Sequence, residues 1–132
     1  MDSIVHFEIP ADDTKRASKF YQEAFGWMIM PMPEMNYTMV STTASNEQGM
    51  PQNPGAINGG MPSRKEFKQM TGSEHTVVTI AVGDIDVSLQ KIEKLGGKKV
   101  VGKNSIGDMG WTAYFKDTEG NVVGLWQPAQ PM

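Results

Sequence analysis

The chain contains two copies of one pattern, a strand followed by a capped helix and a glycine, and this internal duplication limits its possible folds more than any other feature. In the first copy IVHFEIP alternates as a strand does, Asp13 can cap the helix that follows, and Gly26 can end it. A shift of 71 residues places Asp13 on Asp84 and Gly26 on Gly97. Such a repeat predicts two copies of one supersecondary unit.

Each half holds three more extended segments after its helix. They are WMIMPM, NYTMVSTT and GAINGGMP in the first half, and KKVVGK, GWTAYFKD and NVVGLWQP in the second. Each half therefore reads βαβββ. A four-stranded sheet with one helix on its back leaves its other face uncovered, so two such modules are expected to pair. The predicted fold class is α+β, with tandem βαβββ modules forming a curved, half-open barrel around a central cleft.

The module boundaries follow from where the pattern is interrupted. We predict a single domain over 1–132, with module one at 3–60, a polar linker at 61–74 and module two at 75–128. A second polar stretch, 43–54, has little that could enter a core and is predicted to form a flap. The cleft between the modules is the expected ligand site.

Composition excludes several classes of protein. The chain has 132 residues with 12 basic and 15 acidic side chains, a net charge of −3, so nucleic acid and anionic membranes are not expected partners. No segment reaches the roughly 20 apolar residues of a membrane span, and the first residues lack signal-peptide features. The absence of cysteine excludes disulfides and thiolate metal sites. We expect a cytoplasmic protein.

Several segments together resemble the vicinal oxygen chelate superfamily, which includes glyoxalases, bleomycin-resistance proteins and extradiol dioxygenases. They are HFEIPADD, FYQEAFGW, GAINGG, AVGDID with LGG, and YFKDTEGNVVGLWQ. The branch that looks nearest is the one related to lactoylglutathione lyase. The resemblance implies paired βαβββ modules. It also implies a divalent metal in the cleft of catalytic members, held by one side chain from the first and one from the last strand of each module.

The repeat assigns these four metal-ligand positions to His6, Asn58, Val77 and Gly124. His6 offers an imidazole and Asn58 a neutral amide oxygen, whereas valine and glycine offer no donor atom. Divalent sites of the imidazole-and-carboxylate kind need three or four donors. We therefore predict that the metal site is degenerate and that the protein holds no cofactor.

A divalent metal ion remains the alternative. His75 lies two residues from Val77 on the same strand parity, and Glu8 shares the parity of His6. A metal site relocated to His6, Glu8 and His75 is therefore the second hypothesis. His6 and Glu8 are also the candidate catalytic residues, as a proton-transfer pair, and the competing interpretation is a structural polar pair.

Aromatic residues near the last strand suggest a ligand surface. Trp126 shares the parity of Gly124, where no side chain fills the space, so a planar or apolar group could stack there. Tyr37 and Trp111 are further candidates, although alternation alone does not fix their faces. The predicted ligand-binding residues are His6, Asn58, Trp126, Tyr37 and Trp111.

Two functions follow from these observations. The first is a protein that binds a small organic ligand between its modules without the family metal. The alternative is a lyase or isomerase, or a dioxygenase-like enzyme, that uses His6 or Glu8 with a weakly held divalent ion. Met28, Met30 and Met32 share one strand face, which indicates a ligand surface, gap-filling core or a subunit contact. The family resemblance also implies a homodimer.

Overall fold

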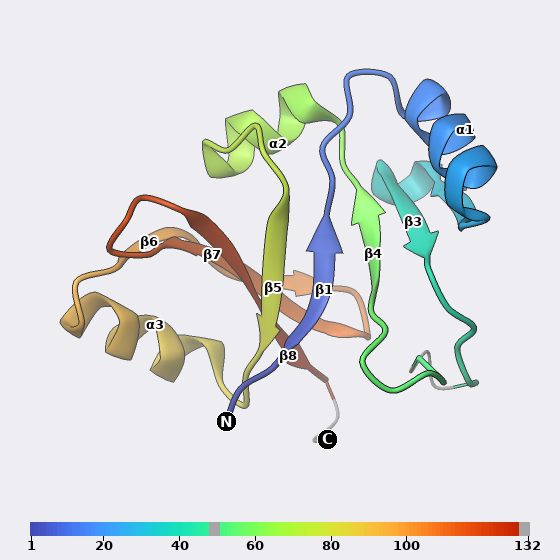
Figure 1. Cartoon of the computed structure of the whole chain (residues 1–132). Coiled ribbons are helices and arrows are strands. Elements are labelled where there is room, and N and C mark those ends of the chain that lie inside the picture. Colours follow the sequence, from blue (N-terminus) through green and yellow to red (C-terminus); the bar gives the residue numbers. More distant parts are fainter. Residues whose placement is uncertain (48–50, 130–132) are drawn as a thin grey trace. The chain divides into compact units, whose positions relative to one another are not determined.

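The computed structural model describes residues 1–47 and 51–129 (Figure 1) and divides into two compact units. Unit 1 comprises Met1–Val5, Met70–Ser73 and Val77–Met132, and unit 2 comprises His6–Gln69 and Glu74–Thr76. The units are described separately below. None of the helices in the described ranges has the length and hydropathy needed to span a membrane.

The sheet of unit 2 has the strand order β2-β3-β4-β1. Strand β1 runs parallel to β4, whereas the β2–β3 and β3–β4 pairs are antiparallel. A short 3₁₀ helix, η1, separates β2 from β3. The elements are β1 (Ile4–Glu8), α1 (Thr14–Phe25), β2 (Met28–Met32), η1 (Pro33–Met35), β3 (Tyr37–Ser41) and β4 (Asn58–Met61).

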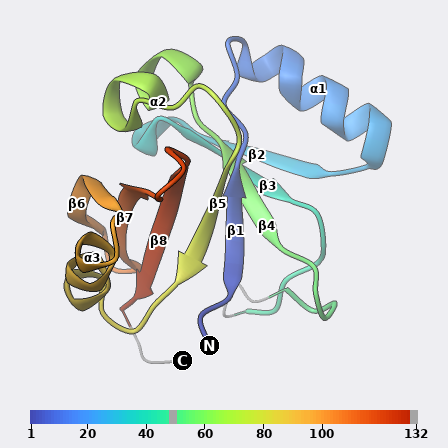
Figure 2. The same cartoon turned by 60° about the vertical axis from the view of Figure 1, so that its left-hand side comes forward.

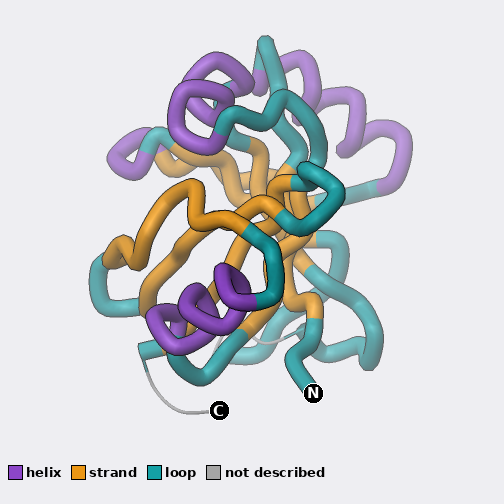
Figure 3. The backbone as a smooth tube through the Cα atoms, turned by 90° about the vertical axis from the view of Figure 1, so that its left-hand side faces the viewer, coloured by secondary structure: helices purple, strands orange, loops and turns teal. Residues whose placement is uncertain are grey.

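Unit 1 repeats this topology in the order β6-β7-β8-β5, with β5 parallel to β8 and the other pairs antiparallel. Helix α3 lies beside β6 and β7 (Figure 2). The elements are β5 (Val77–Ala81), α3 (Ile85–Lys94), β6 (Lys98–Ile106), β7 (Gly110–Lys116) and β8 (Val122–Pro128). The predicted α+β class and the βαβββ pattern of both modules are confirmed (Figure 3).

The N-terminal caps of α1 and α3 form as the sequence predicts, whereas α3 ends at the C-cap Leu95 and the glycine with positive φ after it is Gly96 and not Gly97. The Asp13 carboxylate accepts the amide hydrogen of Arg16 at 3.0 Å, and that of Asp84 accepts the amide hydrogen of Val87 at 3.1 Å. Gly26 ends α1 with φ +72°, the left-handed conformation that a side chain disfavours. Both helices therefore begin at matched acidic caps.

The hydrophobic core of unit 1 lies between α3 and its sheet. Ile85 and Leu89 of α3 are buried against strand residues that alternate toward the helix. The buried cluster consists of Val82, Ile85, Leu89, Ala113, Phe115 and Leu125. Because one face of β7 and β8 packs against α3, their opposite face is the one available for other contacts.

The segment 61–74, predicted as a linker, contains a third helix, α2 (Arg64–Thr71). The buried side chains of Met61 and Phe67 give this otherwise polar stretch an apolar anchor. Arg64 adds polar contacts, since its Nε donates to Asp12 Oδ1 at 2.9 Å and its Nη2 donates to the Pro10 carbonyl at 3.2 Å. The predicted flap, 43–54, includes residues 48–50, which lie outside the described residues.

Candidate functional site

One face of the unit 2 sheet gathers most of the side chains predicted to be functional. His6 and Glu8 alternate onto the same face of β1, and their register partners on β4 are Asn58 and Gly60. The β3–β4 register brings Tyr37 to this face as well, because Met39, two residues away, pairs with Gly60. Phe7 points to the opposite face, where its ring lies 6.0 Å from that of Trp27. We call the first face the His6 face.

The imidazole of His6 is fixed by Tyr37. His6 Nε2 lies 3.1 Å from the Tyr37 hydroxyl oxygen, within hydrogen-bonding distance. Burial lowers the pKa of His6 below its ordinary value, because desolvation disfavours the charged ring. At neutral pH the imidazole is therefore neutral, and one of its nitrogens can accept a proton or a hydrogen bond.

Tyr37 holds this position because Gly60 has no side chain. A Cβ built at Gly60 would lie 1.9 Å from the Tyr37 hydroxyl oxygen and about as close to the ring carbons. The ring thus occupies the space directly above the glycine. The sequence motif GAINGG contributes a flat platform here.

Glu8 is a buried carboxylic acid on the same face, with only 5% of its surface exposed. A buried acid needs partners, and Glu8 is among the residues with polar or electrostatic interactions. Its strand position, two residues from His6, places both predicted catalytic groups on one surface.

Asn58 supports the loop beside the site. Its Oδ1 accepts the backbone amide hydrogens of Thr42 at 2.8 Å and Thr43 at 3.3 Å, and its Nδ2 donates to Ser45 Oγ at 3.0 Å. The amide oxygen is therefore engaged on both of its lone pairs. These bonds hold the residues that follow β3.

The strand register corrects one predicted position. The amide of Ile9 donates to Gly60 O, and in unit 1 the amide of Val82 donates to Trp126 O. Equivalent positions in the first strands of the two units are thus 73 residues apart in the sequence, whereas the two helix caps are 71 residues apart. Consistently, His6 pairs with Asn58 and Thr79 pairs with Gly124.

Thr79, and not Val77, is therefore the counterpart of His6. The difference arises because two more residues separate the strand from the helix cap in the first copy than in the second. The spacing from Ile9 to Asp13 is longer than the spacing from Val82 to Asp84, and this difference is the sequence signal that could have revealed the true counterpart. Val77 is a buried apolar residue that shares the parity of Thr79.

The corresponding face of unit 1 is filled by hydroxyl and aromatic side chains. A Cβ at Gly124 would lie 2.6 Å from Thr79 Oγ1 and 3.4 Å from the Tyr114 ring. Trp126 shares this face, since it is two residues from Gly124 on β8 and pairs with Thr112 of β7. The predicted placement of Trp126 beside Gly124 therefore agrees with the register.

Trp111 lies on the other face of the unit 1 sheet. It packs against the buried α3 cluster, and Lys103 Nζ lies 4.6 Å from the centre of its ring. Strand alternation explains the split, because Trp111 and Tyr114 are three residues apart on β7. Tyr37 of unit 2, by contrast, is on the His6 face.

Taken unit by unit, the residues at the four predicted positions do not fit the divalent metal that the family resemblance implies. Asn58 can bind a cation only by releasing the amides of Thr42 and Thr43, and Thr79 offers one neutral hydroxyl. The described residues contain no group of three or more His, Asp or Glu side chains placed to hold a metal ion. His75, the alternative ligand, is exposed before β5.

Methionines extend the His6 face toward the edge of the unit 2 sheet. Met30 pairs with Met39, and Met28 pairs with Ser41, so these side chains continue the row from Gly60 across β3 to β2. Met28 is 69% and Met30 56% exposed. The interpretation as gap-filling core is wrong for these two, whereas a ligand surface and a subunit contact remain predictions.

Comparisons with known proteins agree with this architecture. Residues 3–43 match the family model "Bleomycin resistance protein-like N-terminal". A "Glyoxylase-like domain-containing protein" of Didymella fabae is 31% identical over 121 residues, which cover 89% of this chain and 88% of that protein. The "Putative glyoxylase CFP32" of Mycobacterium tuberculosis is 30% identical over 125 residues, or 91% of this chain. The chain spans 43% of the length of this mycobacterial relative.

Solved structures show the same fold at low identity. A hypothetical protein, BH1468, from Bacillus halodurans has a TM-score of 0.66 at 12% identity, covering 99% of this chain and 97% of that one. Methylmalonyl-CoA epimerase from Mycobacterium tuberculosis has a TM-score of 0.61 at 14% identity, covering 96% and 88%. Such likenesses concern the fold alone.

The fold and the sequence relatives together define the class. The chain belongs to the glyoxalase and bleomycin-resistance group of the vicinal oxygen chelate superfamily.

Proposed function

We propose that this protein binds a small organic ligand on the His6 face without the divalent metal of catalytic family members. One observation carries the proposal. The two residues of unit 2 at metal-ligand positions, His6 and Asn58, are engaged by Tyr37 and by the amides of Thr42 and Thr43. A neutral imidazole, a buried acid and exposed thioethers then form a surface suited to a mixed polar and apolar molecule.

Metal-free bleomycin is the first probe, because the matched family model is named after bleomycin resistance. Titration monitored by tryptophan fluorescence and by thermal shift should give saturable binding. His6→Gln should weaken binding about tenfold, the effect of losing one well-placed hydrogen bond to a polar group. Lys94→Gln, at the end of α3 in the other unit, is the control and should bind as the wild type does.

Failure of bleomycin and of a panel of aromatic and thioether metabolites to change either signal would contradict ligand binding. The metal part of the proposal has its own measurement. Elemental analysis of protein purified without chelator should show less than one tenth of an equivalent of nickel, zinc, manganese or iron. One equivalent that disappears in His6→Ala would show that a metal site exists.

A second candidate function is proton transfer at a carbon beside a carbonyl, as in a lyase or isomerase. It is favoured by the buried carboxyl group of Glu8 on the same face as the neutral His6 imidazole. The test is turnover of the hemithioacetal of methylglyoxal and glutathione, with and without added nickel, zinc or manganese. Turnover that Glu8→Gln abolishes would support it, and no turnover under any condition would reject it.

We also propose a homodimer and a cytoplasmic location. The exposed Met28 and Met30 give the unit 2 sheet an apolar edge that a second copy could cover. Light scattering on a sizing column should give twice the chain mass, and Met30→Lys should shift it to the chain mass. A single-chain mass for the wild type would exclude the dimer. Cell fractionation tests the location.

A further inference from the structure

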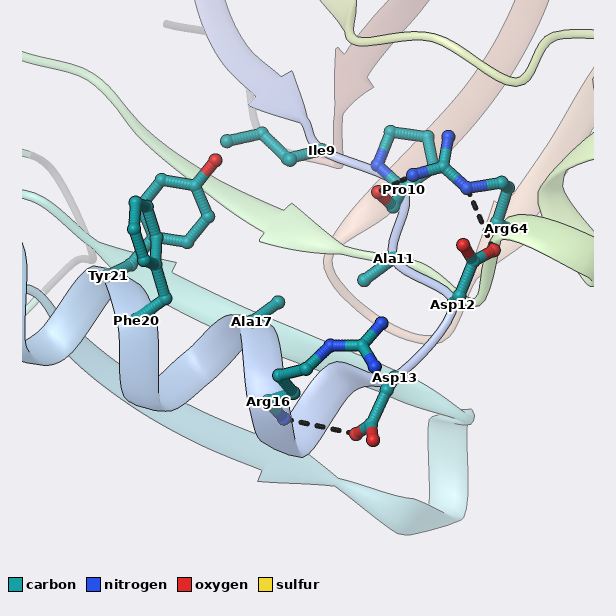
Figure 4. A pocket seen from close by; sticks show the side chains of 10 residues that line it. All are labelled: Ile9, Pro10, Ala11, Asp12, Asp13, Arg16, Ala17, Phe20, Tyr21 and Arg64. Carbon is teal, nitrogen blue, oxygen red and sulfur yellow. Dashed lines mark hydrogen bonds and ion pairs between the residues drawn. The ribbon is translucent and has the colours of Figure 1, made fainter.

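A cavity of about 450 Å³ lies within unit 2, away from the His6 face, between α1 and the segment that follows β1 (Figure 4). Its volume is in the range of small-molecule sites. It exists because α1 stands off the sheet: no residue of this helix is buried. Ala17, Phe20, Tyr21, Ala24 and Phe25 recur at the spacing of an apolar helix face, yet none of them is buried.

Aromatic stacking keeps the helix at this distance. The Tyr21 and Trp27 rings are 4.8 Å apart and nearly parallel, and Trp27 in turn lies 6.0 Å from Phe7 of β1. The stack supports the C-terminal half of α1. Four residues of α1, Arg16, Ala17, Phe20 and Tyr21, border the open space (Figure 4).

The cavity has an apolar wall. Ile9, Ala17, Phe20 and Tyr21 line it, and Phe20 leaves 60% of its surface exposed. An occupant that covers this ring gains free energy because apolar surface is removed from water. The wall therefore suits the hydrocarbon or aromatic part of a ligand.

The rim of the cavity carries charged groups of both signs, Asp12, Asp13, Arg16 and Arg64. Arg64 is occupied by its ion pair with Asp12 at 2.9 Å and by the Pro10 carbonyl. Asp13 is occupied as the cap of α1, where its Oδ1 accepts the Arg16 amide.

Among the described residues of the rim, the guanidinium group of Arg16 is the cation left without an ion pair. It makes no hydrogen bond or ion pair with the part of the chain that the structure describes. Figure 4 shows it extending from α1 toward the Ala11–Asp13 segment. A guanidinium group binds carboxylates in a bidentate manner. Because Asp13 already caps α1, the Arg16 side chain and not the N-terminus of the helix would contact a carboxylate.

We propose that this cavity is a second ligand site, which binds a small amphipathic carboxylate through Arg16 and an aromatic or aliphatic body against Phe20 and Tyr21. It is distinct from the His6 face and independent of the function proposed there. An aromatic acid has the chemistry that both walls recognise.

The probe is 2-naphthoate, titrated by calorimetry, with 2-naphthylmethanol and 2-naphthylmethylamine as its neutral and cationic analogues. We expect the wild type to prefer naphthoate over both. Arg16→Gln should weaken naphthoate binding about tenfold or more, with little change for the alcohol. Lys19→Gln removes the same charge from the same helix outside the cavity and should bind as the wild type does.

Two further measurements locate the site. Ala17→Phe places a bulky ring against the apolar wall of the cavity and should weaken naphthoate binding, while far-UV circular dichroism reports that the variant is folded. In amide NMR spectra, naphthoate should shift the signals of residues 9–21 and leave Asn58 unchanged. Absence of naphthoate binding, equal affinity in Arg16→Gln, stronger binding of the amine, or shifts centred on Asn58 would each overturn the proposal.

Discussion

Replacing Gly60 by alanine tests how tightly the His6 face is assembled. The new methyl group would lie 1.9 Å from the Tyr37 hydroxyl oxygen, far inside van der Waals contact, so the ring must move. Overpacking of this kind costs about 1–3 kcal/mol. Displacing Tyr37 also breaks its hydrogen bond with His6, which contributes about 1 kcal/mol. We therefore expect a loss of about 2–4 kcal/mol in the free energy of unfolding.

Urea denaturation followed by circular dichroism measures this loss. Gly83→Ala is the matched control, since no atom lies within 4 Å of the added carbon, and it should cost nothing or stabilise slightly. A double-mutant cycle isolates the cause: in a Tyr37→Ala background, Gly60→Ala should cost less than about 0.5 kcal/mol. If the full cost persists without the ring, the contact with Tyr37 is not its origin.

Three more predictions concern single residues. Asn58→Ala should lower the stability by about 1–3 kcal/mol and speed hydrogen exchange at the Thr42 amide, because that amide loses its acceptor; unchanged exchange would contradict the loop-holding role. Because burial lowers the pKa of His6, the unfolded chain takes up the proton more readily, and the stability should fall as the pH drops below about 6.5. His6→Gln should flatten this part of the pH profile in urea midpoints, and an identical slope would refute the assignment. Ile85→Ala should cost about 2–5 kcal/mol in thermal or urea unfolding, because its side chain is fully buried in the core of unit 1; a smaller effect would show that the site collapses around the cavity.

The parts of the fold that depend on local chemistry could be predicted from the sequence. An aspartate before an apolar helix and a glycine after it act through contacts a few residues away, so Asp13, Asp84 and Gly26 are recognisable directly. The repeat then predicted that the chain folds as two βαβββ modules. Alternation placed His6 and Glu8 together on one strand face.

The predictions that failed concerned positions that are set by contacts with residues far away in the sequence. The counterpart of His6 is set by hydrogen bonds between strands. Because the first copy has two additional residues between its strand and its helix, this counterpart is Thr79 and not Val77. Trp111 could be assigned a face only once its strand was packed against α3. The cavity at Arg16 left no sequence signal, because it results from how far an aromatic stack holds α1 from its sheet.

The close fit of Thr79 against Gly124 also limits which residues position 124 can accept. A carboxylate introduced at position 124 would bring its Cβ to 2.6 Å from the threonine hydroxyl oxygen, so the neighbour would have to be replaced at the same time. A metal-holding residue at position 58 would likewise detach the loop beyond β3. Building metal ligands into positions 58 and 124 thus requires compensating substitutions at Thr79 and in the loop beyond β3, so no single replacement is enough.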